Sequence, residues 1–162
     1  MEDQQSLVEQ WVNRYRGRDL TLEMCGYIFG GRYGETFLRI RDYRLTPDTI
    51  VLVFSRDERL EVFRPQSVEL VPKAPPYNLI EKRPNDTALV IRRCQKLRFT
   101  WYSYGEDPTD ENLCEHVYEQ PADSEEVVHR ERLSWRRRKH PTIETRTNVD
   151  EMLRLSPEPD FR

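Results

Sequence analysis

The chain has 162 residues, which is about the size of one domain. Hydrophobic residues make up 36% and charged residues 34%, against about 25% charged residues in an average soluble protein. The formal net charge of −3 argues against bulk electrostatic capture of nucleic acid or of an anionic membrane. No apolar run approaches the roughly 18 residues of a membrane-spanning helix.

The cysteines and the start of the chain bear on the cellular compartment. Cys25, Cys94 and Cys114 are odd in number and widely spaced, which fits neither a disulfide framework nor a Cys-x-x-Cys zinc or redox site. The acidic start Met1–Gln5 lacks the basic-then-apolar pattern of a secretory signal. We therefore expect a cytoplasmic protein with reduced thiols.

The first predicted element is a helix over residues 4–16. Its apolar residues recur at three- and four-residue spacing and form one stripe: Leu7, Val8, Trp11, Val12 and Tyr15. Gly17 follows as a stop signal. We expect the stripe to pack across one face or opening of a sheet.

Residues 20–71 predict a first β meander, because the hydrophobic period switches to two. Short turns at 46–48 and 55–58 join successive strands, so the strands are expected to be antiparallel. Pro65 is expected to end one strand, and Ser67–Val71 to add a short edge strand.

A proline-rich connector over residues 72–87 leads to a second β group over residues 88–147. We favour a connection within one domain over a hinge. The second group contains apolar or alternating runs at 88–91, 97–104 and 113–118, and a predicted hairpin formed by 127–135 and 142–147. Asn148 and Glu151 resemble a capping box, which predicts a short helix to Leu155 and then a loose tail to residue 162.

These elements predict a single α+β domain, mainly β, over residues 1–162. Its centre is expected to be a curved or barrel-like antiparallel sheet with covered edges. An N-terminal amphipathic helix packs on it, and a short C-terminal helix follows the last strand.

Metal-binding and catalytic signals are sparse. His116 lies two residues from Cys114, so both side chains face the same side of a strand, but zinc requires three or four ligands. His129 and His140 would join them only if the fold brought them near. The chain has no Gly-x-Ser-x-Gly elbow and no recognisable Cys–His signature. We therefore assign no catalytic residue, no metal and no cofactor.

The glycine-rich segment is the most unusual feature, since four of the six glycines fall within residues 26–34. The first interpretation is a tightly turned loop whose aromatic side chains pack on the core. The functional alternative is a ligand or partner site shared with the aromatic strand that ends at Gly105. The candidate contact residues are Tyr27, Phe29, Arg32, Tyr33, Trp101, Tyr102 and Tyr104.

A resemblance rests on three segments: Gly26–Gly34, Leu60–Pro65, and Leu97–Gly105 with Pro108–Thr109 and Asn112–Leu113. They resemble a family of small bacterial proteins that share a conserved domain without an assigned activity. The resemblance covers residues 18–120. It implies that the glycine-rich segment and the aromatic strand belong to one unit, and it carries over no catalytic residue.

The favoured function is a non-enzymatic binding or protein-interaction module that uses the glycine- and aromatic-rich surface. The sequence does not identify its partner: another protein and a second copy of the chain are the candidates, and a membrane is not expected. The first alternative is a nucleic-acid-binding protein that uses the basic hairpin over residues 129–140. Its contact residues would be Arg132, Trp135, Arg136, Arg137, Arg138 and Lys139. The second alternative is a small enzyme with a carboxylate or tyrosine pocket.

Overall fold

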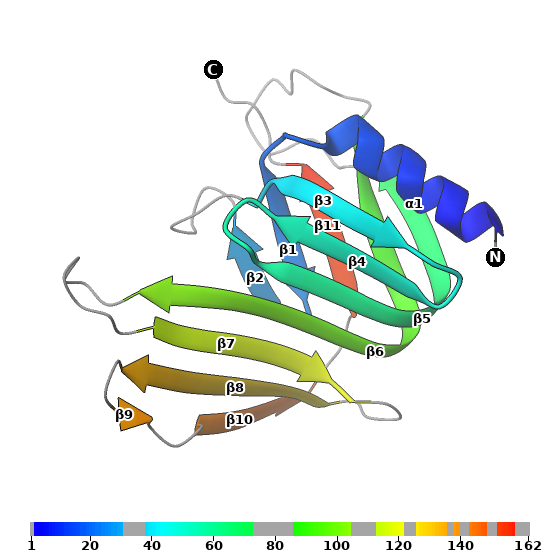
Figure 1. Ribbon diagram of the computed structural model, residues 1–162. Helices are drawn as coiled ribbons and strands as arrows, with labels where there is room; N and C mark the ends of the chain where they lie inside the picture. The colour runs from blue at the N-terminus through cyan, green and yellow to red at the C-terminus, as the bar shows by residue number, and fades with distance from the viewer. Residues whose placement is uncertain are drawn as a thin grey trace, which may run out of the picture.

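The computed structural model describes residues 2–30, 38–72, 86–104, 113–121, 126–135, 138–139, 143–148 and 152–157. Within these ranges the chain forms one helix, α1 (Glu2–Tyr15), and a single antiparallel sheet of eleven strands (Figure 1). The mainly β fold with an N-terminal helix is therefore confirmed. No helix in the described ranges is long and apolar enough to cross a membrane.

Every pairing between the described strands is antiparallel, and the sheet has eleven strands. In chain order they are β1 (Leu20–Met24), β2 (Tyr27–Gly30), β3 (Ile40–Leu45), β4 (Thr49–Phe54), β5 (Arg59–Pro72), β6 (Thr87–Tyr104), β7 (Leu113–Gln120), β8 (Glu126–Trp135), β9 (Arg138–Lys139), β10 (Ile143–Asn148) and β11 (Leu153–Pro157).

Helix α1 packs against β3 and is joined to the first residue of β6 by side chains of its apolar stripe. Val8, Trp11, Val12 and Tyr15 are all buried, as the sequence predicts. The Trp11 indole N–H donates to the carbonyl oxygen of Thr87 over 2.9 Å, and the Thr87 N–H donates to the Tyr15 hydroxyl oxygen over 2.8 Å. The helix is therefore attached to the sheet by hydrogen bonds as well as by apolar packing.

Strand β6 organises the sheet because it has different neighbours along one of its edges. Along one edge it pairs with β5 from Thr87 to Thr100. Along the other edge its first part pairs with β11, and its second part, from Leu97 onward, pairs with β7. The sheet consequently divides at β6 into two parts.

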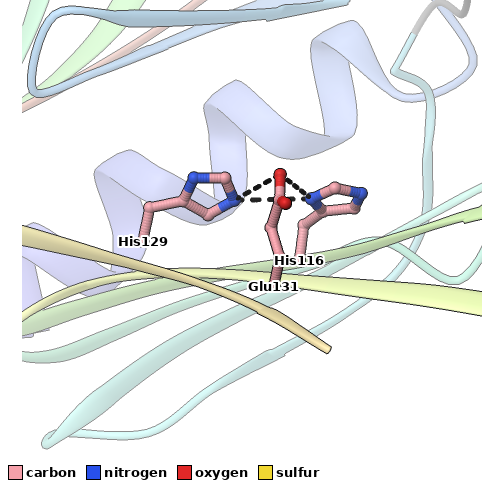
Figure 2. A group of neighbouring side chains, drawn as sticks. All are labelled: His116, His129 and Glu131. Carbon is pink, nitrogen blue, oxygen red and sulfur yellow. Dashed lines mark hydrogen bonds and ion pairs between the residues drawn. The ribbon is translucent and has the colours of Figure 1, made fainter. Parts of the chain in front are cut away.

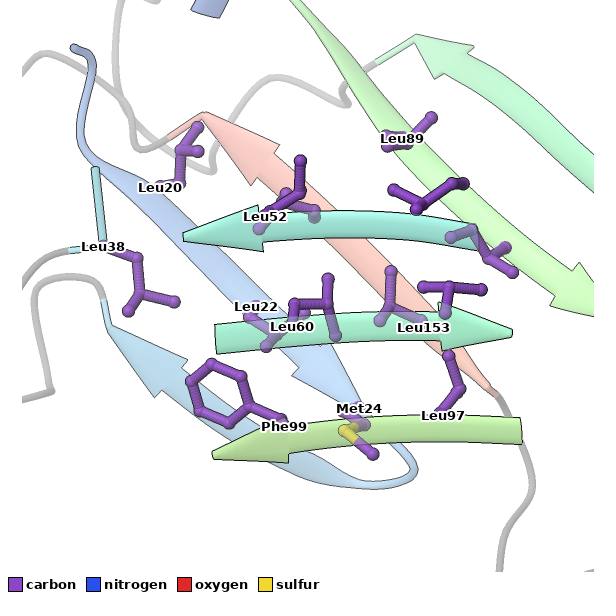
Figure 3. Packing of buried hydrophobic residues seen from close by; sticks show 14 of the residues in the cluster. Leu20, Leu22, Met24, Leu38, Leu52, Leu60, Leu89, Leu97, Phe99 and Leu153 are labelled. Atoms are coloured by element: carbon purple, nitrogen blue, oxygen red, sulfur yellow. The ribbon is translucent and has the colours of Figure 1, made fainter. Parts of the chain in front are cut away.

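The first part is a strongly curled half-barrel of β1–β6 and β11. In Figure 1, β1, β2 and β11 lie behind β3 and β4, and α1 crosses the upper end. The Leu20 N–H donates to the Leu38 carbonyl oxygen over 2.7 Å, which brings β1 against the segment that leads into β3. Large aliphatic side chains from both layers fill the interior (Figure 3).

Two glycines of the glycine-rich segment are required by this geometry. Cys25 (φ 54°) and Gly26 (φ 85°) form the two-residue turn between β1 and β2, and positive φ at both positions is the requirement of a type I′ hairpin turn. At Gly30 (φ 77°) a Cβ atom would lie 2.8 Å from the Leu20 carbonyl oxygen. The tight turn expected from the sequence is present at Cys25 and Gly26, but Tyr27–Gly30 forms strand β2 rather than a loop, and residues 31–34 lie outside the described ranges.

The second part, which we call the wing, consists of residues 97–104 of β6 with β7, β8, β9 and β10. It extends away from the helix (Figure 1). Strands β8 and β10 pair in antiparallel register, with Glu131 opposite Ile143, which confirms the predicted hairpin.

The predicted short C-terminal helix is wrong, because Leu153–Pro157 forms β11. This strand lies between β1 and β6, and Leu153 and Leu155 are fully buried. Pairing on both edges and burial of two leucines outweigh a local capping signal at Asn148 and Glu151.

Pro65 does not end its strand, contrary to the prediction. Strand β5 continues from Arg59 to Pro72 through an irregularity in which Arg64 has φ 48° and the register shifts between Pro65 and Val68. A bulge accommodates proline because the extra residue leaves the hydrogen-bond ladder. The predicted edge strand Ser67–Val71 is therefore the continuation of β5, and residues 73–85 of the connector lie outside the described ranges.

The hydrogen bond from Thr87 to Tyr15 yields a stability prediction. Tyr15→Phe keeps the buried ring but leaves the Thr87 N–H without this acceptor, so we expect the free energy of unfolding to fall by about 1–2 kcal/mol. Tyr43→Phe is the matched control, because it removes an exposed hydroxyl bond to Asn13 and is expected to cost less. Urea unfolding followed by circular dichroism measures both. Equal losses would contradict the anchoring role of Tyr15.

Candidate functional site

The two sides of the wing differ in chemistry because successive side chains of a strand alternate between faces. One side carries Trp101, His116, Tyr118, His129 and Glu131, and we call it the ring face. The opposite side, the charged face, bears a hollow of about 620 Å³. The hollow is lined by Arg59, Glu61, Arg98, Thr100, Tyr102, Glu115, Val117, Glu119, Arg130 and Arg132.

Charges of both signs offset one another in this hollow. Arg98 donates to a Glu119 carboxylate oxygen over 2.9 Å and lies 3.8 Å from a Glu61 carboxylate oxygen. Glu115 stands opposite Arg132 in the β7–β8 register. The charged face is thus a mixed ionic surface rather than a concentrated basic patch.

Six aromatic side chains form a continuous series that we call the ring row: Trp101, His116, His129 and Tyr118 of the ring face, followed by Tyr27 and Phe29 of β2. Trp101 stacks on His116 with ring centroids 4.0 Å apart, and Tyr118 stacks on His129 at 3.9 Å. Tyr27, from β2, contacts Tyr118 at 4.7 Å. The row therefore connects the half-barrel to the wing.

Both ring nitrogens of His116 lie close to polar groups. It is 8% exposed, and its Nε2 lies 3.0 Å from the Ser103 hydroxyl oxygen. Its Nδ1 lies 3.3 Å from Glu131 Oε1 and 3.4 Å from His129 Nε2. One imidazole thus contacts a hydroxyl on β6 and two further polar groups on β8.

His129 and Glu131 complete a three-residue cluster, in which His129 Nε2 lies 3.7 Å from Glu131 Oε1 (Figure 2). Figure 2 shows the two imidazoles directing one nitrogen each toward the carboxylate between them. Nitrogen and carboxylate oxygen atoms that converge in this way are able to hold a transition-metal ion.

Burial lowers the pKa of both histidines below the ordinary value of 6.5. At His116 the Glu131 carboxylate opposes this shift and His129 adds to it, and at His129 the same carboxylate opposes it. At pH 7 both imidazoles are therefore neutral, and each carries one nitrogen lone pair.

Ser103, His116 and Glu131 also stand in the order of a serine-hydrolase triad, with the hydroxyl at Nε2 and the carboxylate at Nδ1. A triad requires one carboxylate to orient one imidazole. Here the same oxygen atom of Glu131 lies near both imidazoles, so the carboxylate is not dedicated to orienting His116 as it would be in a triad.

The strand registers bring this cluster together. Trp101 stands opposite His116, His116 opposite Glu131, and Tyr118 opposite His129. The sequence predicts His116 and Cys114 on one side of a strand, joined by His129 only if the fold brings it near, and the fold does bring His129 near. Glu131 is a member of the cluster that the sequence does not predict. His140 lies outside the described ranges.

The candidate binding residues do not form one site. Tyr27, Phe29 and Trp101 belong to the ring row, whereas Tyr102 lines the hollow on the charged face. Arg32 and Tyr33 lie outside the described ranges, and only the backbone of Tyr104 is described.

Of the candidate nucleic-acid contacts in the basic hairpin, only Arg132 has a described side chain. Arg132 lines the mixed hollow opposite Glu115. Trp135, Arg138 and Lys139 lie in strands whose side chains are not described there, and Arg136 and Arg137 lie outside the described ranges. Binding by the basic hairpin stays a prediction.

A scan against models of protein families, a search of curated proteins and a search of solved structures each found no match to this chain. The resemblance to small bacterial proteins therefore stays a prediction, and the site rests on its own geometry.

The thiols give a prediction about reactivity. Burial raises the pKa of Cys25 to about 12 and that of Cys94 to about 11. At pH 8 only about one Cys25 thiol in ten thousand is then the reactive thiolate. We expect iodoacetamide to leave Cys25 unmodified in the folded protein and to modify it in urea, as read by peptide mass spectrometry. Equal labelling in both conditions would show that Cys25 is not buried.

Proposed function

We propose that the protein is a non-enzymatic binding protein of the cytoplasm, and that it holds a flat, apolar ligand with a hydrogen-bond acceptor against the ring row. Tyr27, Phe29 and Trp101 are half-buried, so each contributes ring surface beside a packed neighbour. Aromatic rings provide large apolar contact area and prefer offset or edge contacts with other rings.

The observation that carries this proposal is the indole N–H of Trp101. It is buried, and it has no hydrogen-bond partner in the part of the chain that is described. Buried indole N–H groups usually have a partner, and leaving one unpaired costs about 1–3 kcal/mol. Because the N–H itself is buried, a ligand acceptor reaches it and offsets that cost only when the atoms that cover the indole edge move aside on binding.

The cytoplasmic setting is supported by the cysteines, because Cys25, Cys94 and Cys114 are all free thiols. We also propose a bacterial origin, which the resemblance to small bacterial proteins implies. A protein partner instead of a small ligand would use the same rings, and competition between the partner and a small aromatic probe would reveal it.

The test uses 8-anilinonaphthalene-1-sulfonate, a flat apolar probe whose sulfonate accepts hydrogen bonds. We expect saturable binding with quenching of tryptophan fluorescence. Trp101→Phe keeps a ring but removes the N–H, so affinity should fall about tenfold or more, as for a hydrogen bond to a charged acceptor. Tyr102→Phe, on the charged face, is the control and should leave affinity unchanged.

Two results would overturn this proposal. The first is the absence of saturable probe binding by the folded wild-type protein. The second is equal affinity in Trp101→Phe and in the wild type, with near-ultraviolet circular dichroism showing that both are folded.

The Ser103–His116–Glu131 order is also that of acyl transfer by a serine nucleophile, and this is the rival activity that the binding proposal excludes. A fluorophosphonate probe tests it by covalent attachment at Ser103. We expect no labelling, because Glu131 is shared between two imidazoles. Labelling that disappears in Ser103→Ala would replace the binding proposal with a hydrolase.

A further inference from the structure

We propose that His116, His129 and Glu131 form a binding site for one divalent transition-metal ion, and that zinc is the ion that this donor set fits best. The site goes beyond the proposed ligand binding, since it uses the polar edges of the two imidazoles rather than their faces. The inference stands on the geometry of three atoms: His116 Nδ1, His129 Nε2 and Glu131 Oε1.

The separations of these atoms match a tetrahedral metal site. They are 3.4 Å between the two nitrogens, 3.3 Å from His116 Nδ1 to the carboxylate oxygen, and 3.7 Å from His129 Nε2 to the same oxygen. Zinc–ligand bonds of about 2.0–2.1 Å at tetrahedral angles put neighbouring ligand atoms about 3.3–3.4 Å apart. Octahedral ligands at about 2.1 Å would be closer, at about 3.0 Å.

The neighbours of His116 prepare it as a ligand. When its Nε2–H donates to the Ser103 hydroxyl, the lone pair is on Nδ1, the nitrogen that faces the cluster. Metal-ligating histidines usually donate their second N–H to a neighbouring acceptor in this way, which fixes the tautomer and the ring orientation.

Stacking holds both imidazoles in place. Trp101 lies parallel to His116 within 10°, and Tyr118 lies parallel to His129 within 7°. Stacking thus fixes the plane of each ring, so little side-chain entropy is lost when an ion binds.

Hydrogen bonding alone is the competing explanation for this arrangement. A proton on His116 Nδ1 lies within reach of both Glu131 Oε1, at 3.3 Å, and His129 Nε2, at 3.4 Å. A divalent cation would instead interact with all three groups at once, and a metal titration distinguishes the two arrangements.

The donor set also narrows the choice of ion. Two imidazole nitrogens and one carboxylate oxygen suit zinc and its neighbours in the first transition series, whereas magnesium and calcium prefer oxygen ligands alone. Three protein ligands leave one tetrahedral position outside these side chains, which is typical of zinc sites that keep an exchangeable ligand.

The experiment uses the full chain, stripped of metal with a chelator and titrated with Co²⁺, a spectroscopic substitute for zinc. We expect a visible absorption spectrum of tetrahedral Co²⁺ that saturates at one ion per chain and disappears when Zn²⁺ is added. Calorimetry with Zn²⁺ then gives the dissociation constant.

Glu131→Gln and His129→Asn remove one ligand each. Glu131 is 38% exposed, so its isosteric replacement should fold. Both variants should lose more than the 10- to 100-fold in affinity that loss of a supporting residue typically costs, and Ser103→Ala should fall within about that range. Glu115→Gln is the matched control, since it removes a carboxylate from the opposite face of β7 and should bind zinc as the wild type does.

A featureless Co²⁺ titration of the folded wild type would overturn the metal site, as would unchanged zinc affinity in both ligand variants. These outcomes are separate from those of the probe experiment. Trp101→Phe keeps a ring against His116, so it should weaken probe binding and leave zinc affinity unchanged.

Discussion

The structure depends on one strand that takes part in two different pairings. Strand β6 keeps β5 as its neighbour along most of its length, while its opposite edge passes from β11 to β7. The two parts of the sheet thus share a continuous backbone and cannot slide past each other without breaking the β5–β6 ladder. Because the same strand carries Leu89 and Phe99 in the core and Trp101 beyond it, the core fixes where the wing begins.

Stacking and register together position the polar cluster in the wing. An imidazole on an exposed strand would rotate freely about its side-chain bonds. Here each imidazole lies flat against a larger ring from the adjacent strand, Trp101 in one case and Tyr118 in the other. Stacking therefore sets the plane of each imidazole, and the Ser103 hydroxyl contact with Nε2 orients the His116 nitrogens within that plane.

Local patterns predicted the parts of the fold that local forces determine. The stripe of α1 and the β8–β10 hairpin follow from periodicity and turn chemistry, and both are confirmed. Strand β11 was not predictable from the residues next to it in the sequence, because pairing with the distant strands β1 and β6 stabilises its extended conformation. The bulge at Arg64 and Pro65 was likewise not predictable from the local sequence, because β5 pairs with β6 on both sides of it.

The candidate site was partly within reach of the sequence. Counting outward from a loop near residues 121–125 places His116 near Glu131 and Tyr118 near His129, as the register shows. A slip of one residue would send these side chains to opposite faces, and the sequence alone cannot exclude such a slip. The stacking of Trp101 on His116 depends in addition on the β6–β7 register across residues 105–112.

The position of β11 has a consequence for the order in which the chain acquires structure. Leu22 pairs with Leu155, and Met24 pairs with Leu153, so strands from the two ends of the sequence lie side by side. During synthesis the early strands are made long before their neighbour exists. Until residues 153–157 leave the ribosome, the edges of β1 and β6 that β11 covers lack their native partner, and closure must bring distant parts of the chain together. The half-barrel is therefore completed only after residues 153–157 have been synthesised.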